Sequence, residues 1–189
     1  MNLPLPQVAD IQAGVPTYPD ADAIASFLTV KNLTEDGRLQ GSGDALKPEL
    51  KKIQRYLLKA SDILLAARST SLRCAMLDAE SVPAFFNSTL LRIRCNPDFL
   101  NPEFLYAWLS HPVGRDAVAS VSRSGTAQMS LTVAGLKKLN VPVPPIDSQA
   151  RLAELLSSAR QAHSAAVTAA ETRLSLAREI ALHSLTANH

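Results

Sequence analysis

Residues 124–149 read SGTAQMSLTVAGLKKLNVPVPPIDSQ, and they join two parts of the chain that differ in physical character. The stretch opens with a small polar loop that contains Gln128, continues as a short apolar strand over 139–143 and ends with a proline pair. Proline cannot donate a hydrogen bond to a sheet, so this strand is short or lies at a sheet edge. From residue 146 to residue 189 the sequence contains no proline or glycine, which is typical of a long helix. The stretch therefore predicts a globular domain before it and a helical arm after it.

Length and composition set the class of protein. A chain of 189 residues, of which 47% are hydrophobic and 19% charged, has room for one well-packed domain and an appendage. No apolar run approaches the roughly 20 residues that cross a bilayer, and residues 1–6 lack the features of a signal peptide. Cys74 and Cys95 are too few for a disulfide framework and have no zinc-ligand spacing, so ordinary thiols are expected. We expect a cytoplasmic protein that needs no metal or other cofactor.

Positive charge is concentrated in the first part of the chain, although the net charge is only +2. Between residues 47 and 73, Glu49 and Asp62 are the acids, and the bases are Lys47, Lys51, Lys52, Arg55, Lys59, Arg68 and Arg73. From residue 147 onward, acids and arginines balance. This distribution favours an N-terminal domain that faces a polyanion.

The first part of the domain is expected to contain short strands separated by turns. The apolar and alternating patterns predict strands near 8–14, 27–30, 62–68 and 85–95. In the last of these, apolar residues alternate with Arg92 and Arg94, which predicts a sheet with one exposed face. Pro48 at a first helical position favours a short helix over 47–58.

Three helix signals follow in the second part of the domain. Asn101 as cap and Pro102 in the first turn predict a helix that stops near residue 110. A second short helix is expected over 112–120. Thr132 can cap a single helical turn before the proline-bounded strand.

Residues 147–189 are expected to form one long helix or a broken pair. With Asp147 or Ser148 as cap, the helix extends to about residue 185, which at 1.5 Å per residue gives about 55–60 Å. Large side chains are few and the middle is rich in alanine, so a lone helix buries little area and needs a partner face. The expected interface is Leu152, Leu155, Leu156, Ala159, Ala166, Ala170, Leu174, Ala177 and Ile180.

Four short motifs follow one another along the chain. They are Asp10-Ile11-x-x-Gly14, Leu58-x-x-x-Asp62-Ile63-Leu64, Gly125-Thr126-x-Gln128-x-x-Leu131, and Leu136-x-x-Leu139-x-Val141-Pro142-x-Pro144-Pro145-x-x-x-Gln149. Their order and spacing over nearly the whole chain resemble a specificity (S) subunit of type I restriction-modification enzymes. Members of that family typically carry two recognition domains and two spacer helices, whereas this chain has one of each. It resembles a half-subunit, so either it forms a homodimer or it is a shortened form.

The resemblance implies a fold and a non-catalytic function. The expected fold is α+β, with a target-recognition domain over 1–146 that has a twisted mixed β-sheet and short flanking helices, followed by one long C-terminal helix over 147–189. The family implies a domain that reads one half of a bipartite site in double-stranded DNA. It also implies that the helix sets half-site spacing and docks DNA adenine methyltransferase subunits, in a complex with a restriction subunit that translocates and cleaves DNA.

The candidate DNA contacts divide by chemistry. Glutamine can pair with adenine and arginine with guanine in the major groove, and arginine or lysine can hold phosphate. The loop candidates are Ser124, Gly125, Thr126, Gln128 and Ser130, with Arg123 beside them as a phosphate contact. Further phosphate candidates are Lys51, Lys52, Arg55, Arg68 and Arg73, and Ser69 and Thr70 are candidates for base edges. The alternatives stay open: the loop can be an ordinary surface turn, and the bases can be a solvated face.

Other functions are less well supported by the sequence. The segments 96–99 and 101–104 each have an Asn-Pro start but lack the second proline of an adenine methyltransferase motif, and turn and helix-start chemistry explains both. Pro19-Asp20 and Glu49-x-Lys51 imitate a nuclease signature, but Glu49 lies at an expected helix start rather than on a buried strand. The four histidines, His111, His163, His183 and His189, have no partner acids at ligand spacing. The main alternative is a helical adaptor or assembly protein whose globular domain binds protein rather than DNA.

Overall fold

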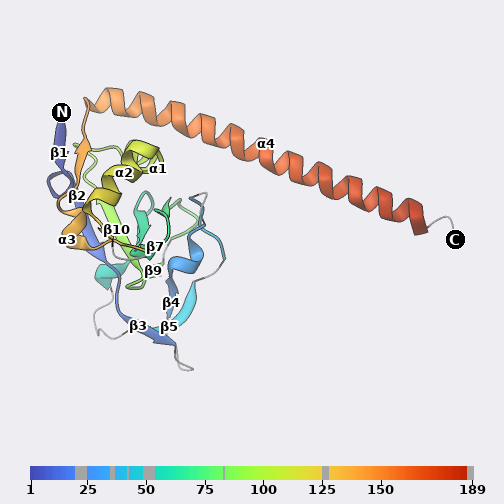
Figure 1. The fold of residues 1–189 in the computed structure, drawn as a ribbon, viewed down its shortest axis with the longest axis horizontal. Helices are drawn as coiled ribbons and strands as arrows, with labels where there is room; N and C mark the ends of the chain where they lie inside the picture. Colours follow the sequence, from blue (N-terminus) through green and yellow to red (C-terminus); the bar gives the residue numbers. More distant parts are fainter. Residues whose placement is uncertain are drawn as a thin grey trace. The chain divides into compact units, whose positions relative to one another are not determined.

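The computed structural model of the protein describes residues 1–19, 25–34, 37–41, 43–48, 54–82, 84–124 and 128–186 (Figure 1). The chain divides into two compact units, Met1–Ala150 and Arg151–His189. The first unit contains short strands and short helices, and the described residues of the second all lie in helix α4 (Ile146–Thr186). The predicted α+β class with one long C-terminal helix is confirmed.

Within the described residues, the strands of the first unit form four small sheets rather than one continuous sheet. The central sheet has the order β2 (Ala9–Ala13), β10 (Leu90–Cys95), β6 (Ile63–Ala66) and β8 (Cys74–Met76), with every pair antiparallel. A second sheet has the order β3 (Thr17–Pro19), β5 (Asp44–Pro48), β4 (Ala25–Leu28) and β9 (Phe85–Phe86), and its β4–β9 pair is parallel. The third sheet contains β11 (Arg123–Ser124), β12 (Met129–Ser130) and β7 (Arg68–Ser69), and the fourth pairs β1 (Asn2–Pro4) with β13 (Asn140–Pro142).

The helices begin where capping chemistry predicts. Helix α1 (Pro102–Ser110) starts after Asn101, whose Oδ1 accepts the N–H groups of Glu103 and Phe104 at 2.9 and 3.1 Å. Helix α2 (Pro112–Val121) and the single turn α3 (Val133–Leu136) follow, and the Thr132 side chain caps α3. Among the described residues, the unit also contains three 3₁₀ turns: η1 (Leu5–Gln7), η2 (Val30–Asn32) and η3 (Gln54–Tyr56).

The short helix expected over 47–58 is wrong in its first part. Pro48 is the last residue of strand β5, where it is paired with Thr17. Proline is tolerated at a strand end because the hydrogen bond that it cannot donate is not needed there. Residues 49–53 lie outside the described part of the chain, and the helical residues that follow are the 3₁₀ turn η3.

The two arginines of strand β10 do not form an exposed face, so that prediction is also wrong. The Arg92 side chain is 3% exposed and forms an ion pair with Asp10. Arg94 binds both carboxylate oxygens of Asp62, with Nε and Nη2 each 2.6 Å from an oxygen. The alternation of β10 is therefore between an apolar face and a face of ion pairs, each with one buried member, Arg92 or Asp62, and one member that water reaches, Asp10 or Arg94.

Gly14 permits a close approach between the end of β2 and the segment after β9. A Cβ atom at this position would lie 2.0 Å from the carbonyl oxygen of Asn87, which is backbone and cannot rotate away. Beside this crossing, Val15 N–H donates to Phe86 O at 3.1 Å. The crossing borders a hydrophobic core cluster that includes Phe27, Tyr56, Leu64 and Phe86. The glycine of the first motif thus lets two sheets meet over a common core.

Helix α4 is one continuous element of 41 residues, which corresponds to about 60 Å. It begins at Ile146, one residue before the earlier of the two predicted caps. Each of the nine residues predicted to form an interface is exposed, and among the larger ones Leu155 is 66% and Ile180 70% exposed. In the part of the chain that the structure describes, no helix is both long and apolar enough to cross a membrane.

Candidate nucleic-acid interface

The sheet of β11, β12 and β7 brings together predicted contact residues that are far apart in sequence. Strand β12 lies in the middle, with β11 and β7 antiparallel on either side. Ser130 of β12 is paired with Arg123 on one side and with Arg68 on the other. Residues directly opposite one another in antiparallel strands share a face of the sheet. Arg68, Ser130 and Arg123 therefore form a line across one face, which we call the basic row.

The geometry of the basic row suits an extended anion. Neighbouring strands are about 4.8 Å apart, so the Cα atoms of Arg68 and Arg123 are separated by roughly 10 Å. Both arginine side chains are exposed, and Ser130 is half-buried between them. Neither guanidinium has a hydrogen bond or ion pair with another described residue. Two cations held at a fixed separation by backbone hydrogen bonds can contact two positions of one phosphate chain.

The other predicted residues of this region differ in exposure. Gln128 is exposed immediately before β12, and Thr70 is exposed immediately after β7. Ser69 is 8% exposed and is paired with Met129, and its hydroxyl donates to the carbonyl of Ser71. This placement on the covered side disfavours a base contact for Ser69. Ser124 is the second residue of β11, whereas Gly125, Thr126, Lys51 and Lys52 lie outside the described residues.

Two further predicted phosphate contacts lie on other elements. Arg55 is exposed on η3, and its guanidinium carbon lies 4.8 Å from the centre of the Tyr56 ring. The same side chain donates from Nη2 to the Tyr56 hydroxyl at 2.6 Å. Arg73 is half-buried, and its carbonyl accepts the N–H of Ala66 at 3.0 Å. The pairing of β7, β12 and β11 joins Arg68 to Arg123 but includes neither Arg55 nor Arg73.

A surface hollow of about 510 Å³ lies beside the basic row. Arg68 and Ser130 belong both to the row and to the lining of the hollow. The lining combines buried leucines, half-buried apolar side chains and exposed hydroxyl groups. Its other members are Ala13, Val30, Ala67, Ser88, Thr89, Leu91, Leu131, Thr132 and Val133.

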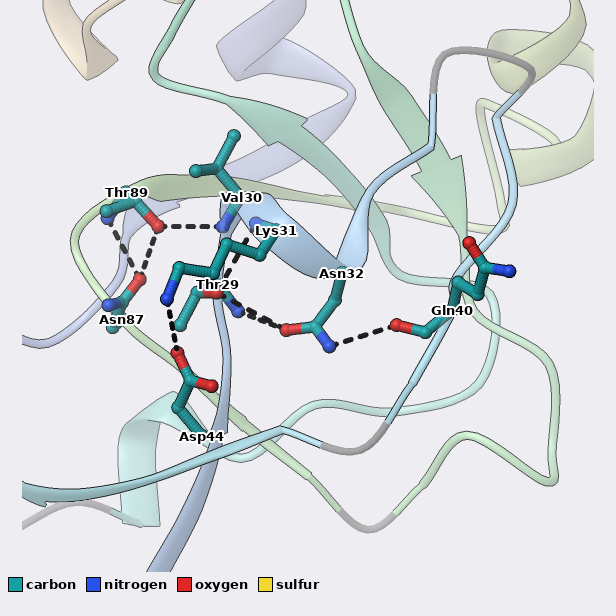
Figure 2. Close-up of polar contacts among 8 residues, drawn as sticks. All are labelled: Thr29, Val30, Lys31, Asn32, Gln40, Asp44, Asn87 and Thr89. Atoms are coloured by element: carbon teal, nitrogen blue, oxygen red, sulfur yellow. Dashed lines mark hydrogen bonds and ion pairs between the residues drawn. The ribbon is translucent and has the colours of Figure 1, made fainter.

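Figure 2 shows the polar contacts around Val30 and Thr89, which line the hollow on two different segments. The hydroxyl of Thr89 accepts the N–H of Val30 at 2.9 Å and donates to Asn87 Oδ1 at 2.5 Å. On the η2 side, the Asn32 side chain accepts the N–H of Thr29 at 2.9 Å and donates to the carbonyl of Gln40 at 3.0 Å. The Val30–Thr89 bond fixes the η2 turn against the turn before β10, and the other bonds hold each turn in shape, so the hollow has defined walls.

Gln149 is a structural residue to which the sequence assigned no role beyond its place in a motif. It is fully buried, and its Oε1 accepts the N–H of Asn101 at 2.8 Å. Its Nε2 donates to the carbonyls of Phe99 and Pro144 at 3.0 and 2.8 Å. Gln149 thus connects the first turn of α4 to the start of α1 and to the segment after β13. The signal that could have identified Gln149 is a glutamine in the first turn of a helix whose neighbouring residues face solvent. That pattern does not indicate which residues the glutamine binds.

The cysteines and His111 have the features of structural residues. Cys74 and Cys95 are free, and burial raises the pKa of the Cys95 thiol to about 12, so it stays protonated. His111 caps α2 through its Nδ1, which accepts the N–H of Val113 at 3.3 Å. Across the described residues, no group of three or more His, Cys, Asp and Glu side chains could hold a metal ion. Asp20 and Glu49 of the nuclease-like pattern lie outside those residues.

The fold, a domain of short strands and helices followed by one long helix, is the one that the resemblance implied. The family model described as the type I restriction modification DNA specificity domain matches residues 19–166. The chain therefore belongs to the family of type I restriction-modification DNA specificity domains. Specificity domains of this family are non-catalytic. The prediction of a non-catalytic specificity subunit from the motifs is therefore confirmed.

Two solved structures share the fold. One comes from work on the structural basis of complex assembly and conformational transition of the type I R-M system. It is 18% identical, has a TM-score of 0.66 and aligns over 94% of this chain and 43% of that chain. The HsdS subunit from Thermoanaerobacter tengcongensis is also 18% identical, with a TM-score of 0.59 over 87% of this chain and 38% of its own. The chain thus spans about two fifths of the length of these chains. No curated protein matches the sequence.

Proposed function

We propose that the domain reads one half of a bipartite site in double-stranded DNA, with the basic row against the sugar-phosphate backbone. The observation that carries the proposal is the alignment of two exposed arginines, Arg68 and Arg123, across β7, β12 and β11. Phosphate contacts fix the register of a protein on a duplex, and uncharged side chains beside them read base edges. Gln128 and Ser130 have the position and chemistry for reading base edges. Glutamine pairs with adenine, and a hydroxyl group can hydrogen-bond to either base of a pair.

We assign to helix α4 the recruitment of partner chains. Its exposed apolar residues supply a face for a methyltransferase subunit, which brings the restriction subunit into the complex, or for a second copy of the chain. A second copy would supply the other half-site, because identical chains most often associate with two-fold symmetry. In functional terms we place the recognition domain at 1–146 and the arm at 147–189.

The first prediction tests the basic row. Replacing Arg68 or Arg123 with alanine is expected to weaken binding to the preferred duplex about tenfold at 0.15 M salt, because each change removes one charged phosphate contact. The slope of log K against log salt concentration should fall by about 1 for each variant, with little change in sequence preference. Fluorescence anisotropy over a salt series, with the preferred and a scrambled duplex, measures both quantities.

The control for this prediction removes the same charge elsewhere. Arg178 is exposed on α4 and lies off the proposed interface face, so Arg178→Ala alters net charge equally but should leave affinity and salt slope unchanged. If wild-type protein binds both duplexes equally, sequence recognition is refuted, and the adaptor hypothesis becomes the better one. If the slope is unaltered in Arg68→Ala, that residue does not contact DNA.

The second prediction tests the helix. Replacing both Leu152 and Leu156 with aspartate places charges on the proposed apolar face. Burying an ion there has a large free-energy cost of desolvation. We expect monomers by light scattering, or loss of binding to the methyltransferase subunit, with an unchanged circular dichroism spectrum. Ser158→Asp introduces charge at an exposed position outside the proposed interface and should have neither effect. Wild-type association of the double variant would locate the interface elsewhere.

A further inference from the structure

The hollow beside the basic row has an apolar interior that phosphate contacts do not use. Leu91 and Leu131 line it and are 3% and 2% exposed. Each therefore presents a small apolar surface to the hollow, while the rest of its side chain is packed in the core. Ala13, Val30 and Val133 also line it. A small apolar group that enters the hollow would exchange water for contacts with these side chains.

The polar groups of the hollow fall into two sets. The hydroxyls of Thr89 and Thr132 accept backbone N–H groups, at 2.9 and 3.0 Å, and so take part in the architecture of the walls. The hydroxyls of Ser88 and Ser130 make no hydrogen bond to another described residue. Together with the guanidinium of Arg68, they are the groups available to a ligand.

We propose that the hollow receives the C5-methyl edge of a thymine in the bound duplex and thereby selects thymine at one position of the half-site. The proposal rests on the proposed function, since the basic row must hold the duplex. Arg68 belongs to both features, so a phosphate chain that lies along the row is brought to the mouth of the hollow by charge complementarity. In the major groove, thymine presents a methyl group beside the O4 acceptor. The apolar lining matches the methyl group, and a serine hydroxyl can donate to O4.

The discriminating experiment removes only the methyl group. The full chain, with its methyltransferase subunit if it binds poorly alone, first selects a preferred sequence from a random duplex library. Each thymine of that sequence is then replaced in turn by deoxyuridine, and the dissociation constant is measured. We expect about fourfold weaker binding at one thymine position, the loss that follows from one methyl group no longer being buried, and no change at the others.

Matched variants connect the effect to the hollow. Ala13→Leu fills the hollow from an exposed position of β2 and should abolish the difference between thymine and uracil without altering the salt slope. Ala134→Leu makes the same change on the exposed side of α3, outside the hollow, and should keep the difference. If Ala13→Leu does not fold, Val133→Ala serves instead, because a shortened wall should reduce the difference.

The outcomes separate this inference from the proposed function. Uracil tolerated at every position of a duplex that is still preferred over a scrambled one would overturn the thymine contact and leave DNA recognition standing. A selected half-site without thymine would overturn it as well. If no sequence is enriched, the proposed function fails and the thymine contact fails with it. A thymine effect that persists unchanged in Ala13→Leu places the methyl contact outside the hollow and also refutes the inference.

Discussion

Replacing Asp62 with alanine is expected to lower the free energy of unfolding by about 3 kcal/mol, because it breaks a buried ion pair and leaves its partner behind. The Asp62 side chain is 1% exposed, whereas that of Arg94 is 30% exposed. Water can therefore solvate part of the Arg94 guanidinium after its partner is removed. The expected loss of stability is therefore at the lower end of the range for buried ion pairs. Asp62 also accepts the N–H of Lys59 at 2.8 Å, and that bond is lost too. For a chain of this size the melting temperature should fall by roughly 6–12 °C.

Two further variants make the Asp62 result interpretable. Asp62→Asn keeps an acceptor for Lys59 N–H and removes the charge, so the difference between the two substitutions separates hydrogen bond from ion pair. Asp44→Ala breaks a surface pair in which Lys31 Nζ lies 3.8 Å from a carboxylate oxygen, and it should cost less than about 0.5 kcal/mol. Urea denaturation measures all three changes. Equal losses for Asp62→Ala and Asp44→Ala would show that burial of the first pair contributes nothing.

Replacing Gln149 with alanine is expected to cost about 3 kcal/mol and to loosen the junction between the domain and α4. The change removes three hydrogen bonds of a fully buried amide. It leaves the N–H of Asn101 and two carbonyls without their partner, and an unsatisfied buried polar group costs about 1–3 kcal/mol. Water that enters the vacated space can recover part of this, so the effects do not add fully.

Hydrogen exchange at Asn101 N–H gives the most direct readout of the Gln149 variant. Its protection should fall by more than the overall loss of stability explains, because the opening is local. Gln161→Ala is the matched control, since Gln161 is exposed on the same helix and its loss should cost less than about 0.5 kcal/mol. Unchanged exchange at Asn101 would contradict the anchoring role of Gln149.

Local chemistry explains which elements could be predicted from the sequence. Asn101 and Thr132 are helix caps as expected, because capping depends on residues three positions away. Strand β6 and the short edge strand β13 also match their apolar and proline patterns. The exposure of Arg92 was predicted wrongly because its alternation with apolar residues looks the same whether the arginine faces water or an acid on a neighbouring strand. Only the pairing of β10 with β2 brings Asp10 close enough to neutralise it.

The candidate site shows the same division between local and long-range information. Charge identified Arg68 and Arg123 separately, as single residues beside polar loops. Their alignment depends on β12, which pairs with both β7 and β11, and no local pattern encodes that arrangement. The hollow is also a product of long-range contacts, since Val30 and Thr89 meet through one backbone-to-hydroxyl bond. Sequence therefore identified the chemical groups, and the fold determined which of them lie side by side.

The pairing of β1 with β13 gives the domain a single point of entry and exit. Leu3 is opposite Val141, and the N–H of Val143 donates to the carbonyl of Met1 at 2.8 Å. The chain thus returns to its first strand just before α4 begins. A short linker could connect these neighbouring segments, and new ends could be opened in a surface loop without dividing the core. The first and last strands of the domain are therefore neighbours, which is the connectivity that circular permutation requires.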